Sequence, residues 1–173
     1  MRIRHAEIDD AEELACLVND IIAEGGKTAI DTPLTSSQFA EWFIIGPHCI
    51  SCLIAATDDA ILGFQTLERF HSDLPSGMAD VATFVAERGR GSGIGRSLAD
   101  ATAAIAEEVG VHCIRAVIQR SNEDAIGYYR SIGFRGNAAT TTSDSIVLTR
   151  RIIPVHVQPE INISGRRGFR TSD

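Results

Sequence analysis

The feature that most constrains this chain is a glycine-rich segment, AERGRGSGIGRSLAD, which runs directly into a helix-like sequence. Gly89, Gly91, Gly93 and Gly95 fall within seven residues, between the apolar run MADVATFVA and an alanine-rich stretch over 93–109. A strand, a glycine turn and a helix in this order place unpaired N–H groups and the positive end of the helix dipole at the turn. Because glycine has no Cβ, an anion can approach those amides closely. The segment therefore predicts a phosphate-binding turn.

Two common phosphate-binding motifs do not match this segment. The P-loop requires a lysine after its last glycine, and the single lysine of the chain, Lys27, lies elsewhere. The dinucleotide fingerprint G-x-G-x-x-G, begun at Gly91, meets Arg96 where its last glycine should be. The acidic residue that this fingerprint needs about 20 positions later, at the end of a strand, is also missing. Both nucleotide-binding interpretations are disfavoured.

A third template fits. The run Arg90-Gly91-Ser92-Gly93-Ile94-Gly95 resembles the R-x-x-G-x-G loop that binds the acyl-CoA pyrophosphate in the GNAT acetyltransferase superfamily. A second block, NEDAIGYYRSIGF over 122–134, is similar to the N-x-x-A-x-x-x-Y-x-x-x-G-F signature of that family. One helix-like and one strand-like segment separate the two blocks, which is the order in the family. The resemblance covers about residues 2–151 and extends to the phosphinothricin and methionine sulfoximine acetyltransferase-like branch.

The resemblance implies an α/β protein of the GNAT-type fold, with a central mixed, mostly antiparallel and splayed sheet flanked by helices. Apolar periodicity in the chain agrees with this order of elements. We expect one domain over 1–151, an acyl-CoA-dependent N-acetyltransferase domain, and a C-terminal tail or arm over 152–173. The expected strands are 2–7, 49–57, 60–70, 78–86, 112–119 and a β-like stretch within 134–151, and the expected helices are 11–25, 36–46 with Ser36 as its cap, 93–109 and 121–133.

The same resemblance assigns residues to acetyl-CoA. Backbone groups of Phe84 and Val85, on the strand before the turn, would bind the pantetheine arm. The backbone N–H groups of the turn would bind the pyrophosphate, with Arg96 at the start of the helix. Asn122 would contact the arm and also cap its own helix, and Arg88 is an open alternative as a phosphate partner. The full expected set is Phe84, Val85, Arg90, Gly91, Ser92, Gly93, Ile94, Gly95, Arg96 and Asn122.

The reaction, acetyl transfer to an amine, determines which catalytic groups we expect. An alkyl amine has a pKa of about 10, so a base or a water relay must take its proton, and the departing thiolate benefits from an acid. Tyr129 matches the family tyrosine near the CoA sulfur and is the expected general acid, whereas Tyr128 points elsewhere on the helix and is expected to pack. Asp80 lies where the phosphinothricin branch carries a glutamate and is the candidate base. The alternatives are Glu68, Glu87, His71 and a bound water.

Charge and composition limit the classes of molecule that the protein is expected to bind. Residues 1–149 carry a net charge of −10 and residues 150–173 a net charge of +3, so the body disfavours nucleic acid and favours an amine. The chain shows neither a long apolar run nor a signal peptide, which predicts a cytoplasmic protein without a membrane partner. We expect a homodimer with a small-molecule amine as acceptor, bound between 23–47 and 70–78. A protein or peptide N-acetyltransferase and a non-catalytic acyl-CoA-binding module are the alternatives.

The cysteines do not indicate a metal site. Cys49 and Cys52 have C-x-x-C spacing, but the chain contains neither a second such pair nor an H-x(3–5)-H partner. Both lie in a strand-like run, where an offset of three points their side chains to opposite faces. We expect plain thiols and no bound metal.

Overall fold

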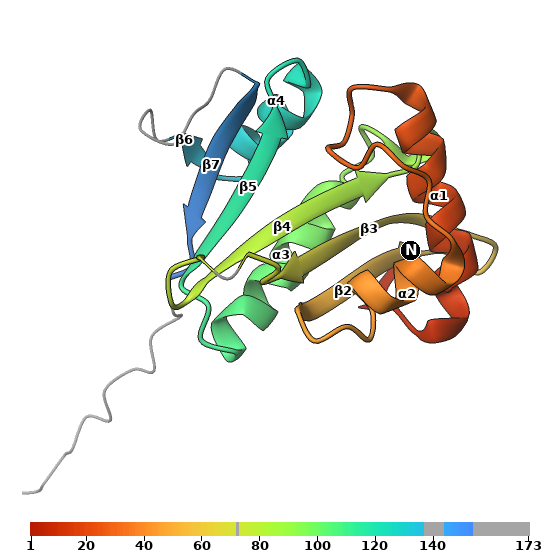
Figure 1. Cartoon of the computed structure of the whole chain (residues 1–173), viewed down its shortest axis with the longest axis horizontal. Coiled ribbons are helices and arrows are strands. Elements are labelled where there is room, and N and C mark those ends of the chain that lie inside the picture. The colour runs from red at the N-terminus through yellow and green to blue at the C-terminus, as the bar shows by residue number, and fades with distance from the viewer. Residues whose placement is uncertain (72, 137–143, 154–173) are drawn as a thin grey trace, which may run out of the picture.

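The computed structural model describes residues 1–71, 73–136 and 144–153, and within these residues one mixed sheet is flanked by helices on both faces (Figure 1). The strand order is β1-β2-β3-β4-β5-β7-β6. The strands are β1 (Arg2–His5), β2 (Cys49–Ala56), β3 (Ile61–Glu68), β4 (Met78–Val85), β5 (Cys113–Gln119), β6 (Arg135–Gly136) and β7 (Ser145–Arg151). The helices are α1 (Ala11–Glu24), α2 (Ser36–Phe43), α3 (Ile94–Glu108) and α4 (Glu123–Ser131), with 3-10 turns η1 (Ile8–Asp10) and η2 (Glu87–Gly89).

The sheet is splayed between its two central strands, as expected. β4 pairs antiparallel with β3 along its length, but it pairs in parallel with β5 only from Met78 to Asp80. Beyond Asp80 the edge of β4 that faces β5 has no strand partner among the described residues, while β5 continues in register with β7. Figure 1 shows β4 and β5 diverging from this short seam. The sheet therefore contains an unpaired strand edge in its interior.

Two apolar cores lie on opposite faces of the sheet. On one face, α1 and α2 pack on β2, β3 and β4, with Phe39 edge-on to Phe64 and Phe64 stacked on Phe84. On the other face, α3 and α4 pack on β5, β7 and the opposite side of β3 and β4. Alternation along β3 and β4 produces this division, because directly paired residues such as Phe64 and Phe84 share a face.

The expected elements are present, and one predicted cap is wrong. Helix α2 begins at Ser36, but its cap is Thr35, whose Oγ1 accepts a 3.2 Å hydrogen bond from the Gln38 amide. The Gln38 side chain completes a capping box by accepting from the Thr35 N–H. Thr35 has the extended backbone that a cap residue needs, whereas Ser36 is already part of the helix.

The end of the domain runs slightly past the predicted boundary at 151. Ile152 is buried in the second core, and its N–H donates a 2.9 Å hydrogen bond to the His112 carbonyl. The predicted tail from 154 onward lies outside the described residues. In the described ranges, no helix has both the length and the apolarity needed to cross a bilayer.

The four cysteines are free thiols. Burial raises the pKa of Cys49 to about 11 and also raises that of Cys52, so neither thiol ionises near neutral pH. The Cys49 thiol donates to the Phe43 carbonyl. These observations agree with plain thiols, but the predicted opposite orientation of Cys49 and Cys52 is wrong. A register shift between Cys49 and Ser51 pairs Cys49 with Glu68 and Cys52 with Thr66, so both side chains pack on the same core.

Candidate active site

Two hollows meet where β4 and β5 diverge. The first, about 570 Å³, is lined by the glycine turn, the start of α3 and one side of α4, and we call it the glycine-turn hollow. The second, about 560 Å³, is lined by the ends of β3 and β5, by β4 and by aromatic side chains of α2 and residue 70, and we call it the aromatic hollow. Six residues line both: Lys27, Thr83, Phe84, Asn122, Ala125 and Tyr129. A molecule held in one hollow therefore meets a molecule in the other at these residues.

The glycine turn has the geometry of an anion site. Gly91 and Gly93 have φ values of 78° and 86°, and a Cβ built on either would meet no atom within 4 Å. The backbone N–H groups of Gly91, Gly93, Ile94, Gly95 and Arg96 make no hydrogen bond within the described part of the chain. They surround the N-terminal end of α3, where the helix dipole is positive. The turn fits a pyrophosphate by backbone donation.

Most of the predicted turn residues line this hollow, and Ser92 is the exception. Arg90, Gly91, Gly93, Ile94, Gly95 and Arg96 are all at its surface. The Ser92 hydroxyl instead donates a 2.6 Å hydrogen bond to the Gly89 carbonyl, which closes the turn from within. Ile94 is buried, so its side chain belongs to the core and its N–H to the turn.

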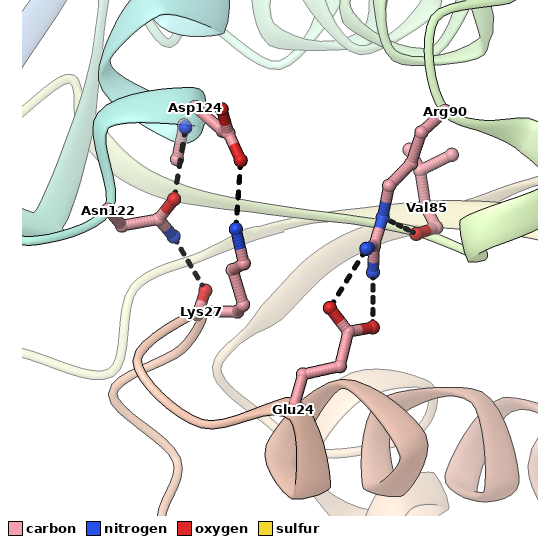
Figure 2. A network of polar contacts seen from close by, with 7 residues as sticks. Glu24, Lys27, Val85, Arg90, Asn122 and Asp124 are labelled. Carbon is pink, nitrogen blue, oxygen red and sulfur yellow. Dashed lines mark hydrogen bonds and ion pairs between the residues drawn. The ribbon is translucent and has the colours of Figure 1, made fainter.

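The arginines near the turn are already bound to protein groups. Figure 2 shows the Arg90 guanidinium donating to both carboxylate oxygens of Glu24 and, through Nε, to the Val85 carbonyl at 3.2 Å. Arg96 donates to the Ser131 carbonyl at 3.2 Å. Arg88 donates to the Ile61 carbonyl and does not line either hollow. Arg90 and Arg96 are thus placed beside the turn, whereas Arg88 is directed away from it.

The predicted strand residues Phe84 and Val85 lie at the edge of the splay. Both line the glycine-turn hollow, and Phe84 also reaches the aromatic hollow. The Ala86 N–H bonds the Leu62 carbonyl on β3, so by alternation the Phe84 backbone groups point to β3. The Val85 backbone groups point to the interval between β4 and β5 that no described strand fills. An extended ligand with amide groups can pair with such an edge as a strand would.

Asn122 joins two segments that are far apart in the sequence (Figure 2). Its Oδ1 accepts from the Ala125 N–H and so caps α4, and its Nδ2 donates a 2.9 Å bond to the Lys27 carbonyl. The Lys27 ammonium pairs with Asp124 at 2.8 Å, and Gln119 Nε2 donates to the Thr28 carbonyl. The loop after α1 is therefore fastened to α4 and the end of β5. Sequence patterns gave no indication of these contacts, because they depend on the tertiary arrangement.

Tyr129 lies at the junction of the two hollows and is only 5% exposed. Its hydroxyl is 3.0 Å from Thr83 Oγ1, and Thr83 Oγ1 also accepts a 2.7 Å hydrogen bond from Gln65 Nε2. Burial raises the pKa of Tyr129 well above its usual value, so the phenol keeps its proton at neutral pH. Thr83 and Gln65 were not predicted. The signal available for both was a polar residue in the middle of an apolar strand.

Tyr128 packs, as expected, but it also borders the site. Its hydroxyl donates a 2.8 Å hydrogen bond to the Gly95 carbonyl, and its ring lines the glycine-turn hollow. Tyr128 therefore attaches α4 to the first turn of α3.

The candidate base Asp80 is held in an ion pair. Its two carboxylate oxygens accept hydrogen bonds of 2.6 and 2.9 Å from Arg115, its partner in the parallel seam. Asp80 lines the aromatic hollow, where its neighbour in register on β3 is Glu68. Glu68 and His71 line the same hollow, whereas Glu87 is exposed and lines neither.

Glu68 differs from Asp80 in that no cation of the described residues forms an ion pair with it. Its Oε2 is buried without a hydrogen-bond partner. Burial raises the pKa of Glu68 to about 7; the charge of Asp80 adds to this rise, and the Thr66 hydroxyl opposes it.

The remaining wall of the aromatic hollow is apolar. Trp42, Phe43 and Phe70 line it together with Ile30, Val81 and Val117. Phe43 is also buried in the core, so the packing and lining roles considered for it coexist. Glu24 binds Arg90, and Asp31 lines neither hollow.

Comparisons with known proteins agree with this geometry. The chain is 26% identical over 136 residues to the putative phosphinothricin acetyltransferase YwnH of Bacillus subtilis, which covers 78% of this chain and 83% of that protein. It is 28% identical over 142 residues to an L-methionine sulfoximine/L-methionine sulfone acetyltransferase of Pseudomonas aeruginosa, with coverage of 76% and 78%. The fold matches that of the phosphinothricin acetyltransferase of Sinorhizobium meliloti, solved in complex with acetyl-CoA, with a TM-score of 0.75, 18% identity and coverage of 87% and 88%.

The model of the acetyltransferase (GNAT) family matches residues 17–134. This span includes the glycine turn, the six residues that line both hollows, and Tyr128 and Tyr129. This chain belongs to the GNAT acetyltransferase family.

Proposed function

We propose that this protein transfers the acetyl group of acetyl-CoA to the primary amine of a small molecule by direct attack, with Tyr129 as the general acid. Acetyl-CoA is the co-substrate. The observation that carries the proposal is the meeting of an anion-binding hollow and an aromatic, acidic hollow at the Tyr129 hydroxyl. Such an arrangement brings a thioester and a nucleophile together at a proton donor.

The glycine-turn hollow suits the nucleotide half of acetyl-CoA. The five unpaired N–H groups from Gly91 to Arg96 would bind the pyrophosphate. The Val85 backbone, on the free edge of β4 next to Phe84, would pair with the amides of the pantetheine arm. Arg90 would contribute a charge-assisted bond once it leaves the Glu24 carboxylate and the Val85 carbonyl. Ser92 supports the turn from inside and would not contact the ligand through its side chain.

Thr83 orients the proton of Tyr129. A hydroxyl has one proton and two acceptor sites. Because Thr83 Oγ1 accepts from Gln65 Nε2, its own proton is available for the Tyr129 oxygen. In that arrangement the phenolic proton of Tyr129 points away from Thr83, toward the shared space of the two hollows. Tyr129 then donates it to the sulfur as the C–S bond breaks.

The aromatic hollow suits an amine with a largely apolar body. Its lining combines aromatic and aliphatic side chains with the carboxylates of Glu68 and Asp80. Among its described lining residues the lysine, Lys27, is paired with Asp124. The relatives reported above are named for phosphinothricin, or for methionine sulfoximine and methionine sulfone, and these amino-acid analogues are the first acceptors to test.

The test is a thiol-release assay with acetyl-CoA and a panel of amines, run on the wild type and on Tyr129→Phe. The panel contains amino acids, methionine sulfoximine, decarboxylated amines, polyamines, aminoglycosides and short peptides. We expect release with one class of small amine and a loss of about 10²–10⁴-fold in kcat for Tyr129→Phe. Preferential acetylation of peptides would replace the small-molecule acceptor by a protein acceptor.

The other alternative, a non-catalytic acyl-CoA-binding module, would bind acetyl-CoA without transferring its acetyl group. If acetyl-CoA raises the Tm but no amine releases thiol, the protein is an acyl-CoA-binding module and the proposal is wrong. The homodimer and the cytoplasmic location stay predictions from the sequence, and sedimentation equilibrium tests the first of them.

A further inference from the structure

The aromatic hollow contains two carboxyl groups, those of Glu68 and Asp80, and the two have different surroundings in the structure. Glu68 and Asp80 are directly paired across β3 and β4, so their side chains leave the same face of the sheet. Both line the hollow that would receive the acceptor. The difference between them lies in what already binds each carboxylate.

Asp80 is fully engaged by protein. Arg115 binds it in a bidentate arrangement, with Nε and Nη2 each on a separate oxygen. A carboxylate whose two oxygens both accept from one guanidinium has little capacity left to bind a substrate ammonium. Moving Asp80 toward a substrate would leave the guanidinium of Arg115, which is partly buried, without its partner.

Glu68 has the opposite environment. Its Oε2 is buried and makes no hydrogen bond, which is costly for a charged oxygen unless a ligand supplies a partner. The groups with a charge or a proton that face it are the Thr66 hydroxyl on β3, Asp80 on β4, Cys49 and Cys52 on β2, and Tyr129 on α4. His71 lines the same hollow. Arg115 is paired with Asp80, which lies between it and Glu68. Among these described groups the arginine is committed to Asp80, so Glu68 is the carboxylate without a cation.

We propose that Glu68, and not Asp80, receives the acceptor amine and takes up the proton that its nitrogen loses during transfer. This assignment rests on the proposed acetyl transfer. The amine first releases one proton to solvent. As its lone pair forms the C–N bond, the second nitrogen proton passes to the Glu68 carboxylate. The C–S bond breaks, and Tyr129 gives its proton to the sulfur. Solvent then deprotonates Glu68 and reprotonates Tyr129, so atoms and charge balance.

The position of Glu68 also explains why a base is available at neutral pH. Burial holds the pKa of this carboxyl at about 7, which is where a base is both ionised and able to accept a proton. Asp80 contributes by placing a negative charge across the strand pair. Asp80 with Arg115 is therefore a positioning pair that fixes the wall of the hollow beside Glu68.

The first experiment measures kcat, and kcat/KM for the amine, against pH for the wild type, Glu68→Gln, Glu68→Asp and Asp80→Asn. Glu108→Gln, an exposed glutamate at the far end of α3, is the matched control. We expect wild-type kcat/KM for the amine, which reports ionisation of the free enzyme, to rise with pH through an inflection near 7. Glu68→Gln should lose about 100-fold in kcat together with this inflection, and Glu68→Asp should recover part of both. Asp80→Asn should keep an inflection but shift it to lower pH, because the Asp80 charge contributes to the raised pKa of Glu68.

A second measurement separates this assignment from the proposed function. Calorimetric binding of 2-phenylethylamine is measured in the presence of CoA, which cannot transfer an acetyl group. Binding about tenfold weaker in Glu68→Gln than in the wild type supports Glu68 as the receiving group even if no amine is ever acetylated. Equal binding by both proteins, or no binding to the wild type, overturns it. So does a Glu68→Gln enzyme with kcat within threefold of wild type and an unchanged inflection. A normal rise in Tm with acetyl-CoA shows that each variant is folded.

Discussion

The Tyr128 hydroxyl donates a 2.8 Å hydrogen bond to the Gly95 carbonyl, and its ring occupies the place where a side chain at residue 95 would begin. A Cβ built on Gly95 would lie 2.7 Å from Tyr128 Cε2 and 3.2 Å from the hydroxyl oxygen. Gly95 is therefore required for a reason different from that of Gly91 and Gly93, whose backbones have positive φ and face open space. The contact fixes the first turn of α3 against α4.

This contact predicts that Gly95→Ala displaces Tyr128 and loosens the turn. We expect a loss of about 1–3 kcal/mol in the free energy of unfolding and a higher KM for acetyl-CoA. Gly127→Ala is the matched control, because Gly127 is an exposed residue inside α4 with no atom near its missing Cβ. It should stabilise the protein by about 0.5–1 kcal/mol. Urea denaturation of both variants measures the difference, and equal stabilities would contradict the steric explanation.

The hydrogen bonds around Thr83 predict a specific effect on catalysis. Thr83→Val keeps the shape of the side chain but removes the hydroxyl between Gln65 and Tyr129. We expect a decrease of about tenfold in kcat with little change in the KM for acetyl-CoA, because the Tyr129 proton is no longer oriented. Thr83→Ser should remain within threefold of the wild type. A Thr83→Val enzyme with full kcat would show that Tyr129 acts without this partner.

The ion pair between Glu24 and Arg90 predicts competition with acetyl-CoA. The same guanidinium cannot bind the Glu24 carboxylate in a bidentate manner and a phosphate at full strength. Glu24→Gln should therefore lower the Kd for acetyl-CoA by about threefold, whereas Arg90→Gln should raise it by about tenfold. Calorimetry at two salt concentrations checks both values. Weaker binding in Glu24→Gln would mean that Glu24 positions Arg90 for the ligand instead of competing with it.

The raised pKa of Glu68 predicts how this residue affects stability. Its folded pKa of about 7 exceeds the ordinary value of 4.5, so the folded state binds more protons than the unfolded state between those two pH values. Stability of the wild type therefore falls across this window as pH rises, because the buried carboxyl becomes charged. Glu68→Gln removes that cost. We expect the variant to be more stable than the wild type by about 2–3 kcal/mol at pH 8 and nearly equal to it at pH 4.5.

Denaturant titrations of the two proteins at pH 4.5 and pH 8 measure this difference. A constant difference at both values would mean that the Glu68 carboxyl is not perturbed in the folded protein.

The glycine turn and the block around Tyr129 were predictable because the functional residues of each motif are close together in the sequence. The turn needs consecutive small residues before a helix, and the helix of Tyr129 carries its cap, its tyrosine and its terminal glycine in one short run. The splay was expected from the family resemblance alone. The strand patterns on either side give no sign that β4 and β5 separate after Asp80.

The roles of the acidic residues could not be predicted in this way. Asp80 lies in the expected strand, but its pairing with Arg115 follows from the parallel register of β4 and β5. Glu68 was only an alternative base, since its burial depends on Asp80 and on the helices covering that face. Likewise, Thr83 and Tyr129 are 46 positions apart in the sequence, and no local sequence pattern indicates that their hydroxyls are in contact.

The short seam between β4 and β5 also bears on self-association. A strand edge with free N–H and C=O groups readily pairs with another chain, and proteins avoid this by keeping their outer strands short or covered. Here the outer strands are β1, with four residues, and β6, with two, whereas the longer unpaired edge of β4 lies inside the sheet. A second copy of the protein cannot lie flat against an edge enclosed by β5 and α4. The fold thus keeps an edge open for an extended ligand without offering it as a template for aggregation.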